Sequence, residues 1–361
     1  MFNCSADVLA YHNDEVTLSQ TERSEMRNRR DANRKRLKDG LADAEKPKPR
    51  EFVSQGSYAM KTMTQHPGNS YDIDDGVYFE KELLIGGRGA ELSALQARQM
   101  VRDALDDGSF SKKPESLKNC VRVYYEAGYH VDIPVYRRVT TKNYFGTETV
   151  HHEIASSDWK RSDARDVTDW FEKENNKQSP DTDNGRQLRR IIRLLKKYAK
   201  SRSSWEDQIL SGFGITKLAT ECFYPDKERE DRSLYQTISK MYNRLIISLV
   251  VNHPVTPNET ITKGYDDSKA RFLKERLKEA LDNLAPLFNV GCTRKEALKS
   301  WDKVFATDFF SYREERTNKA AASLLGSGTT APALSGYSFP SSPRTDSKPR
   351  GFAQCGGLIA R

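Results

Sequence analysis

Asp72 and Asp74 stand two positions apart in the run Tyr-Asp-Ile-Asp-Asp-Gly-Val-Tyr-Phe at 71–79. If this run is a strand, its side chains alternate between two faces, so both carboxylates share one face and Ile73 lies on the other. Two carboxylates on one face of a rigid strand repel each other unless a cation lies between them. Their oxygens, with the phosphate oxygens of a substrate, are ligands that Mg²⁺ prefers. We expect Asp75 to point away from this site.

A third carboxylate, Asp132, lies in the middle of a second strand-like run at 129–136. Val131 and Ile133 belong to the apolar face of this run, and Asp132 belongs to the opposite face. An acid in the middle of such a strand is disfavoured unless solvent or a metal compensates its charge. Pro134 predicts that the strand lies at a sheet edge or ends there. Taken alone, Asp132 equally fits an exposed edge residue or an ion-pair partner.

A Gly-Ser pair forms the third motif, in the sequence Gln55-Gly56-Ser57. Gly56 lets a backbone approach a phosphate closely. Ser57 can begin a helix whose free N–H groups attract an anion, and its hydroxyl can donate to a triphosphate. Taken alone, Gly-Ser equally indicates a helix cap.

The N-terminal part of the chain mixes helices with an antiparallel or mixed sheet. Residues 17–45 predict a long helix, because Ser19 and Glu22 form a capping box. Its few apolar side chains predict one narrow buried stripe: Leu18, Met26, Leu37 and Leu41. Further along we expect a strand–turn–helix at 52–63, a strand at 71–79, a helix near 92–105 and a hairpin at 121–136 that turns at Gly128.

The chain becomes helical from Asp166 onward. Residues 175–185 are polar by composition and predict a loop. Residues 186–202 predict a helix with many arginines and lysines, which in most proteins is a solvated face. Residues beyond about 325 are rich in Gly, Ser, Pro and Thr and indicate a flexible tail.

Each motif also has an ordinary explanation. An Asp-x-Asp on a strand is more often a solvated face or a turn than a metal site. The pair His151-His152 is expected at the surface, because adjacent strand residues cannot both face one metal ion.

Composition limits the class of protein. The 59 Lys and Arg exceed the 51 Asp and Glu, giving a net charge of +8 that suits a polyanion, whether nucleic acid, acidic lipid or a nucleotide triphosphate. The five cysteines are odd in number and widely spaced, which argues against a zinc site or a disulfide framework. Neither a signal peptide nor a run of about 20 apolar residues is present, so we expect a cytoplasmic protein with no membrane partner.

The order of the motifs resembles the nucleotidyltransferase superfamily of DNA polymerase beta. Within it, three runs are similar to those of the bacterial cGAS/DncV-like nucleotidyltransferases, or CD-NTases: 55–57, 72–78 and 130–136. The run 157–165 also resembles the segment that follows the catalytic strands, with Ala164 where a proline is common. The resemblance covers roughly residues 50–310, and the helix at 17–45 fits the family's spine helix.

The resemblance implies an α+β, bilobal, polymerase-beta-like fold with a mixed or antiparallel sheet lobe, a helical lobe and the active site in the cleft between them. We expect residues 1–160 to form the spine helix and sheet lobe, 161–320 the helical lobe and 321–361 the tail. The implied metal ligands and catalytic residues are Asp72, Asp74 and Asp132. The implied nucleotide-binding residues are Gln55, Gly56, Ser57, Lys196 and Thr216.

The same resemblance implies a function. Such enzymes use two Mg²⁺ ions, for which Mn²⁺ can substitute, to join two or three nucleoside triphosphates such as ATP and GTP into a cyclic di- or trinucleotide. No nucleic acid is required. They belong to the bacterial anti-phage systems called CBASS, where the product activates a separate effector. In one CBASS type the C-terminus is conjugated to other molecules, so residues 351–361 are expected to meet a conjugation or regulatory partner or to be an ordinary disordered end.

Two alternatives stay open. The chain could make linear oligonucleotides or modify a macromolecule such as tRNA or protein. It could instead be a basic RNA-binding relative without catalysis, although such a protein has no physical need for three clustered carboxylates.

Overall fold

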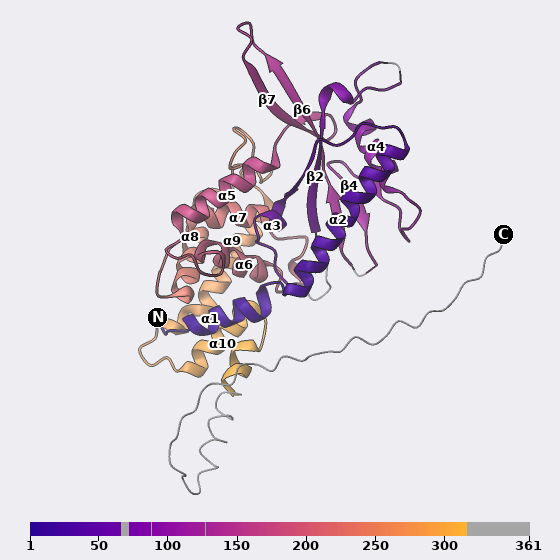
Figure 1. Cartoon of the computed structure of the whole chain (residues 1–361). Helices are drawn as coiled ribbons and strands as arrows, with labels where there is room; N and C mark the ends of the chain where they lie inside the picture. The colour runs from indigo at the N-terminus through magenta and orange to yellow at the C-terminus, as the bar shows by residue number, and fades with distance from the viewer. Residues whose placement is uncertain (66–71, 88, 127, 316–361) are drawn as a thin grey trace, which may run out of the picture. The chain divides into compact units, whose positions relative to one another are not determined.

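The structure is a computed structural model that describes residues 1–65, 72–87, 89–126 and 128–315. The chain forms two compact units, Met1–Glu314 and Glu315–Arg361. The second unit lies almost wholly outside the described residues, and so does the predicted tail at 321–361. Every element named below belongs to the first unit (Figure 1).

The strands of the described residues are β1 Glu51–Gln55, β2 Asp72–Glu80, β3 Glu115–Ser116, β4 Val121–Tyr124, β5 His130–Ile133, β6 Val135–Lys142, β7 Glu148–Ala155 and β8 Trp159–Arg161. The α-helices are α1 Ser5–Tyr11, α2 Gln20–Asp43, α3 Gly56–Ala59, α4 Ala94–Leu105, α5 Ala164–Gln178, α6 Gln187–Ala199, α7 Gly212–Cys222, α8 Glu230–Ile247, α9 Ser268–Leu284 and α10 Arg294–Phe305. Short 3₁₀ or π turns lie at η1 His12–Val16, η2 Lys81–Leu83, η3 Asp183–Gly185, η4 Ser203–Trp205 and η5 Ala285–Phe288.

The sheet is mixed, as predicted, and β2 lies in its middle. Strand β1 pairs antiparallel with β2, while β5 and β6 pair parallel with successive parts of β2. Pro134 separates β5 from β6, so the predicted strand at 129–136 does end at this proline. The hairpin of β4 and β5 is also confirmed. Tyr71, expected at the start of the central strand, lies outside the described residues, and β2 begins at Asp72.

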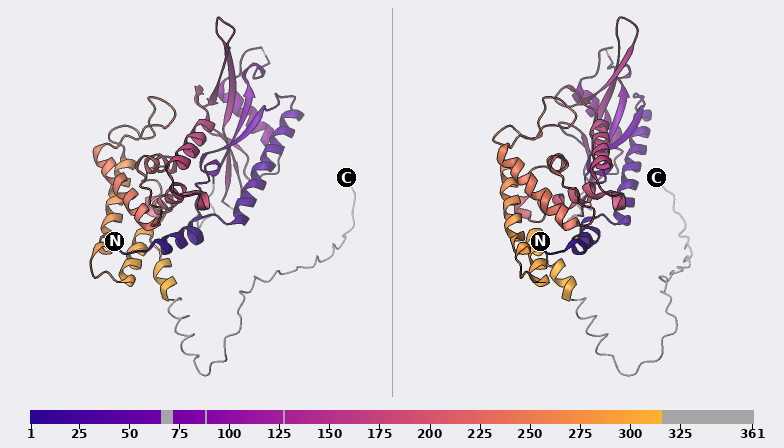
Figure 2. Two further views of the ribbon diagram at one scale, coloured as in Figure 1. Left: turned by 60° about the vertical axis from the view of Figure 1, so that its left-hand side comes forward. Right: turned by 90° about the vertical axis from the view of Figure 1, so that its left-hand side faces the viewer.

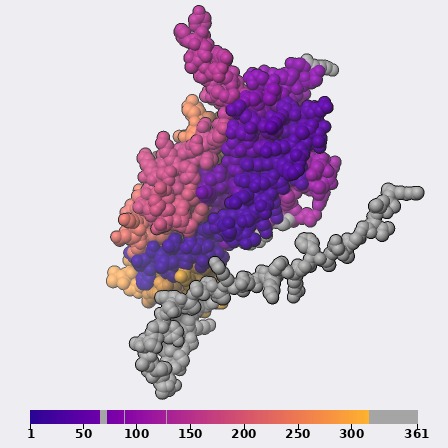
Figure 3. Space-filling model, in the orientation of Figure 1, coloured from indigo at the N-terminus to yellow at the C-terminus, as the bar shows by residue number. Residues whose placement is uncertain are grey.

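Helices α2 and α4 cover one face of the sheet (Figures 1 and 2). The capping box of Ser19 and Glu22 is present at the start of α2, which runs for 24 residues. The predicted stripe is buried in the core beneath this helix: Leu18, Met26, Leu37 and Leu41. In space-filling view, the N-terminal residues, in indigo, form a continuous band across the face that is turned to the viewer in Figure 1 (Figure 3).

The remaining helices pack around α6, whose apolar side chains lie in a second core. Residues from Cys4 to Val16 also belong to this helical core. The expected division at residue 160 therefore does not describe the first 16 residues, which pack with the helical lobe rather than with the sheet.

The loop predicted at 175–185 is wrong for its first part, because α5 continues to Gln178. Asn175 is buried inside this helix, where its side-chain amide donates to the carbonyl of Gly185 and its oxygen accepts from the hydroxyl of Ser179. Composition marked Asn175 as a loop residue, and these tertiary hydrogen bonds explain why it is helical. No helix of the described ranges is long and apolar enough to cross a membrane.

Candidate active site

The three aspartates come from adjacent strands. Asp74 on β2 and Asp132 on β5 are direct neighbours in the parallel ladder, and Asp72 pairs with His130. Alternation along β2 sends Asp75 to the opposite face, where it is buried and accepts two hydrogen bonds from Arg34 of α2. The expected side-by-side placement of the carboxylates, with Asp75 pointing away, is what the register shows.

Two of the three carboxylates have a cationic or ionisable partner. Arg122 of β4 donates to Asp132 with two hydrogen bonds, Nε to Oδ1 and Nη2 to Oδ2, each 2.7 Å long. His130 Nε2 lies 2.5 Å from Asp72 Oδ1. Although burial alone would raise the pKa of Asp72, His130 and Arg122 together hold it below its usual value. Asp132 is thus an ion-pair partner, which was one of the alternatives that the sequence left open.

The electrostatic environment of Asp74 differs from that of the other two aspartates. Burial, together with the neighbouring charges of Asp132 and Asp72, raises its pKa to about 7. In the described part of the chain no basic side chain forms an ion pair with it. A half-buried carboxylate between two others is stabilised by a bound cation, so the donor types and their positions fit Mg²⁺.

The carboxylates are not gathered around one point. Within the described residues, no three acidic, histidine or cysteine side chains are close enough together to hold a metal ion as they stand. The bidentate pair with Arg122 explains this for Asp132, because both of its oxygens face the guanidinium. The residues fit a metal site in type and strand position, and their side chains have to rearrange to form one.

Gly56 brings the Gly-Ser turn against Asp74. Its φ angle is +60°, in the left-handed region, and a Cβ placed on it would lie 2.2 Å from Asp74 Oδ2. Only glycine fits both conditions. The sequence suggested that Gly56 allows close approach to a phosphate, and the structure shows close approach to a carboxylate of the candidate metal site.

Gln55 and Ser57 flank this glycine. Tyr136 donates its hydroxyl to Gln55 Oε1 at 3.0 Å, which fixes the buried amide over β2. Helix α3 is a single turn whose N-cap is Gln55, without a side-chain cap. The helix-cap explanation of Ser57 is therefore not supported, and α3 is too short to contribute much dipole. Ser57 lines the adjacent cavity.

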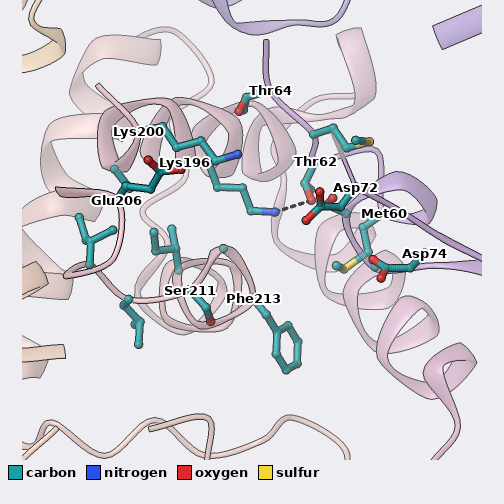
Figure 4. A pocket seen from close by; sticks show the side chains of 18 of the residues that line it. Met60, Thr62, Thr64, Asp72, Asp74, Lys196, Lys200, Glu206, Ser211 and Phe213 are labelled. Carbon is teal, nitrogen blue, oxygen red and sulfur yellow. Dashed lines mark hydrogen bonds between the residues drawn. The ribbon is translucent and has the colours of Figure 1, made fainter. Parts of the chain in front are cut away.

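A cavity of about 980 Å³ adjoins the two aspartates of β2. The sheet lobe contributes Gln55, Gly56, Ser57, Asp72 and Asp74 to its lining. The helical lobe contributes polar and aromatic side chains: Lys196, Lys200, Ser201, Arg202, Ser203, Glu206, Ser211, Phe213 and Lys269. Asp132 is not among the lining residues and is held by Arg122. Figure 4 shows the acidic and basic side chains facing the same space.

Lys196 extends from α6 toward the aspartates (Figure 4). Its ammonium donates to the hydroxyl of Thr62 at 2.8 Å. Burial, together with the nearby charges of Lys200 and Arg193, lowers the pKa of Lys196 to about 7. Among the described residues no acidic side chain forms an ion pair with Lys196. This buried lysine is therefore a suitable contact for an incoming triphosphate, which would restore its full positive charge.

The other basic residues of α6 do not form a solvated face. Arg189 and Arg193 donate to the carbonyls of Met60 and Lys61, at 2.9 and 2.8 Å. Lys197 lies 3.4 Å from the carbonyl of Gln65. Successive turns of α6 thus hold the segment that follows the Gly-Ser turn, and these side chains position the site instead of binding phosphate.

Thr216 does not reach the cavity. It is fully buried in α7, and its hydroxyl donates to the carbonyl of Gly212 at 2.8 Å. The hydroxyl that does line the cavity at this helix belongs to Ser211, the N-cap residue, which accepts from the N–H of Gly214. A Ser directly before the first residue of a helix is a signal for such a cap, but the sequence alone did not place Ser211 at the site.

The run 157–165 links the sheet to α5. Asp163 caps α5 and accepts a hydrogen bond from the hydroxyl of Tyr78, at 3.1 Å. His152 Nδ1 lies 2.8 Å from the carboxylate of Asp163, so His152 is half-buried in this cluster and not at the surface as expected. Arg165 also pairs with Asp163. The cluster fixes the first helix of the helical lobe beside the central strand.

The family comparison defines the class. Residues 50–136 match the nucleotidyltransferase domain described as cyclic GMP-AMP synthase DncV-like. This span contains β1, β2, β5 and the three aspartates. Residues 50–136 are therefore similar to a DncV-like nucleotidyltransferase domain, and the predicted resemblance to the CD-NTases is confirmed.

Solved structures agree with this class in fold. Vibrio cholerae DncV cyclic AMP-GMP synthase, a prokaryotic cGAS homolog, is 16% identical with a TM-score of 0.66, over 86% of this chain and 97% of that one. The same synthase in complex with the linear intermediate 5′ pppA(3′,5′)pG is 17% identical with a TM-score of 0.65, over 84% and 96%. Escherichia coli DncV in its 3′-deoxy GTP bound form is 18% identical with a TM-score of 0.61, over 81% and 92%. The predicted bilobal α+β fold is thereby confirmed.

Ser57 provides a first test of the phosphate side of the site. We expect Ser57→Ala to weaken triphosphate binding several-fold, and the loss of rate to shrink at saturating triphosphate if the hydroxyl contacts ground and transition states alike. Steady-state kinetics with varied triphosphate measure this. Ser54→Ala is the matched control, because Ser54 lies three residues earlier, on β1, and donates to Asp75 on the far face. An unchanged apparent affinity in Ser57→Ala would show that the hydroxyl does not contact the substrate.

Proposed function

We propose that the protein is a template-independent nucleotidyltransferase that condenses nucleoside triphosphates into a cyclic di- or trinucleotide. The observation that supports this most is the register of Asp74 beside Asp132. Asp74 lines the cavity, and so do the Gly-Ser turn and the buried Lys196. The sheet lobe thus contributes carboxylates that can bind cations, and both lobes contribute donors that can bind phosphates, to the same cavity.

The reaction joins a ribose hydroxyl to the α-phosphorus of a triphosphate while the bond to the β-phosphate breaks and pyrophosphate leaves. Two Mg²⁺ ions held by Asp72, Asp74 and Asp132, or Mn²⁺ in their place, would lower the pKa of the hydroxyl and neutralise the leaving group. The chain's own residues bind and orient. Ser57 and Lys196 hold phosphate oxygens, and the rigid strand β2 fixes the two carboxylates relative to each other.

A cyclic product requires the linear intermediate to turn within the cavity and present its own triphosphate to the same carboxylates. The Vibrio cholerae relative has been captured with such a linear intermediate. The cavity of about 980 Å³ has a helical-lobe wall with hydroxyls, a carboxylate at Glu206 and an aromatic ring at Phe213, which are groups suited to hold bases. We propose that this wall selects the bases.

Incubation with one labelled triphosphate at a time, then with pairs, tests this function directly. Thin-layer chromatography should show a new product only with the triphosphates that the helical-lobe wall accepts, ATP and GTP among the candidates. Incorporation into an added RNA or protein, without a small product, would support the macromolecule-modifying alternative.

The biological setting we propose is anti-phage signalling of the CBASS type, with the cyclic nucleotide as messenger to a separate effector. The support is the DncV-like class of residues 50–136. In this setting the tail is a site of conjugation or regulation, and a Pro- and Ser-rich spacer lets such an end reach a partner's active site.

Deleting everything after Thr330 tests the role of the tail. We expect the truncated enzyme to keep its activity in vitro, because all candidate site residues precede this point. Any conjugate seen in cells should disappear. Rates per mole of purified full-length and truncated enzyme provide the measurement. Loss of activity in vitro would mean that the tail belongs to the catalytic fold.

A further inference from the structure

Arg122 faces the carboxylate that a catalytic cation would need. Both N–H···O distances to Asp132 are 2.7 Å, and the two residues are cross-strand neighbours on β4 and β5. A fork-to-fork pair of this kind is strong and fixes the plane of the carboxylate. Asp132 is buried, so its negative charge has little solvent to stabilise it and depends on the guanidinium.

A second bidentate pair lies on the opposite face of the same sheet. Arg34 of α2 holds Asp75 of β2 by Nε at 2.6 Å and Nη2 at 2.5 Å. That pair joins a helix to the sheet and does not line the cavity described above, so holding the fold is a sufficient explanation. Arg122 joins two strands that are already paired by their backbones. Holding the fold together is therefore a weaker explanation for the Arg122–Asp132 pair than for the Arg34–Asp75 pair.

An arginine at this place has two opposite effects on a divalent cation. Its charge repels the cation and competes for the oxygens of Asp132. Its geometry keeps those oxygens beside Asp74, and each carboxylate oxygen has two lone pairs, so Asp132 can bind a cation with one while it accepts an N–H with another. Partners of this kind orient metal ligands in many proteins.

We propose that Arg122 is the positioning residue of Asp132, holding it beside Asp74 and compensating its charge until a divalent cation binds and competes with the guanidinium. The proposal rests on the proposed function, because it needs Asp132 to be a metal ligand. It extends that function by naming the group that sets the cation affinity of the site and the orientation of its third ligand.

The test separates charge from orientation with two variants. Arg122→Met removes both, so the cation-free protein should melt at a lower temperature. The Mn²⁺ or Ca²⁺ concentration for half-maximal thermal stabilisation should fall about tenfold. Its kcat at saturating Mg²⁺ should fall by about 10- to 100-fold. Arg122→Lys keeps the charge without the fork, so its half-saturating cation concentration should stay near that of the unmodified protein while kcat still falls.

Arg34→Met is the matched control. It should lower the melting temperature without changing the cation dependence, because Asp75 faces away from the site. If Arg122→Met and Arg122→Lys both keep the unmodified cation concentration, Arg122 has only a structural role and the proposal is wrong. If the unmodified protein binds no divalent cation in this assay, which uses no nucleotide, the metal site of the proposed function fails as well.

Discussion

Replacing Asp72 and Asp74 together by asparagine is expected to abolish nucleotide synthesis while the protein remains folded and at least as stable as before. Synthesis should fall to background because both ligands on β2 are lost. Stability should not fall, because the substitution removes the repulsion among three clustered carboxylates. The pair of Asp72 with His130 contributes little in compensation, because the Asp72 side chain is largely exposed.

The stability gain should come from Asp74 and depend on pH. Its pKa is raised to about 7 in the folded protein, against about 4 in an unfolded chain. The folded state therefore binds the proton more tightly, and the protein loses stability as pH rises from about 4 to 7. Asp74→Asn should be more stable at pH 8, by about 4 kcal/mol at most, and equal to the unmodified protein near pH 4.

Thermal unfolding between pH 4 and 8 tests the predicted gain of stability, and activity measured on the same preparations tests the predicted loss of synthesis. Asp75→Asn is the control on the same strand. It should lose stability, because Arg34 loses its partner, and keep its activity per folded molecule. An active double variant would contradict the assignment of the site, and a destabilised Asp74→Asn at pH 8 would contradict the electrostatics proposed for it.

Lys196→Met is expected to weaken triphosphate binding at least about tenfold and to stabilise the free protein at pH 7 and below. The pKa of this buried lysine is lowered to about 7, so the folded protein bears the cost of the buried charge below pH 7. That cost disappears as pH rises from 7 toward about 10.5, the pKa in an unfolded chain. The stability advantage of Lys196→Met should vanish over the same interval.

The titration of Lys196 should also appear in the pH dependence of triphosphate binding. Triphosphate affinity of the unmodified protein should decline above pH 7, because the free lysine is then neutral and must take up a proton on binding. Lys196→Met should lack this dependence. Lys197→Met is the control: Lys197 contacts the carbonyl of Gln65 and does not line the cavity, so the affinity should change little. Calorimetry with a non-hydrolysable triphosphate at several pH values measures these effects, and an affinity of the unmodified protein that does not change with pH would contradict this role of Lys196.

The parts of the site that the sequence predicted are those fixed by local geometry. Strand alternation alone separates Asp72 and Asp74 from Asp75, and a capping box alone starts α2. The order of the motifs indicated the class of fold. The neighbouring positions of Asp74 and Asp132 needed only that β2 and β5 pair in register. The catalytic roles of these residues stay a prediction.

The parts that the sequence did not give depend on tertiary contacts. The arginines of α6 were expected in solvent, but the carbonyls of Met60 and Lys61 accept their hydrogen bonds. Thr216 turned inward because a helical threonine can bond to the carbonyl four residues before it. Arg122 was not singled out, since only the register of the β4–β5 hairpin places it opposite Asp132.

The measurement that tests the proposed function most directly is the phosphatase resistance of the product made from α-labelled triphosphates. Purified enzyme with Mg²⁺ should convert label into a small product that survives phosphatase, since a cyclic nucleotide has no terminal phosphate, and the Asp72→Asn, Asp74→Asn protein should make none. If phosphatase releases all of the label in the product as free phosphate, or if the label remains in linear oligonucleotides with free ends, the chain is not a cyclic nucleotide synthase.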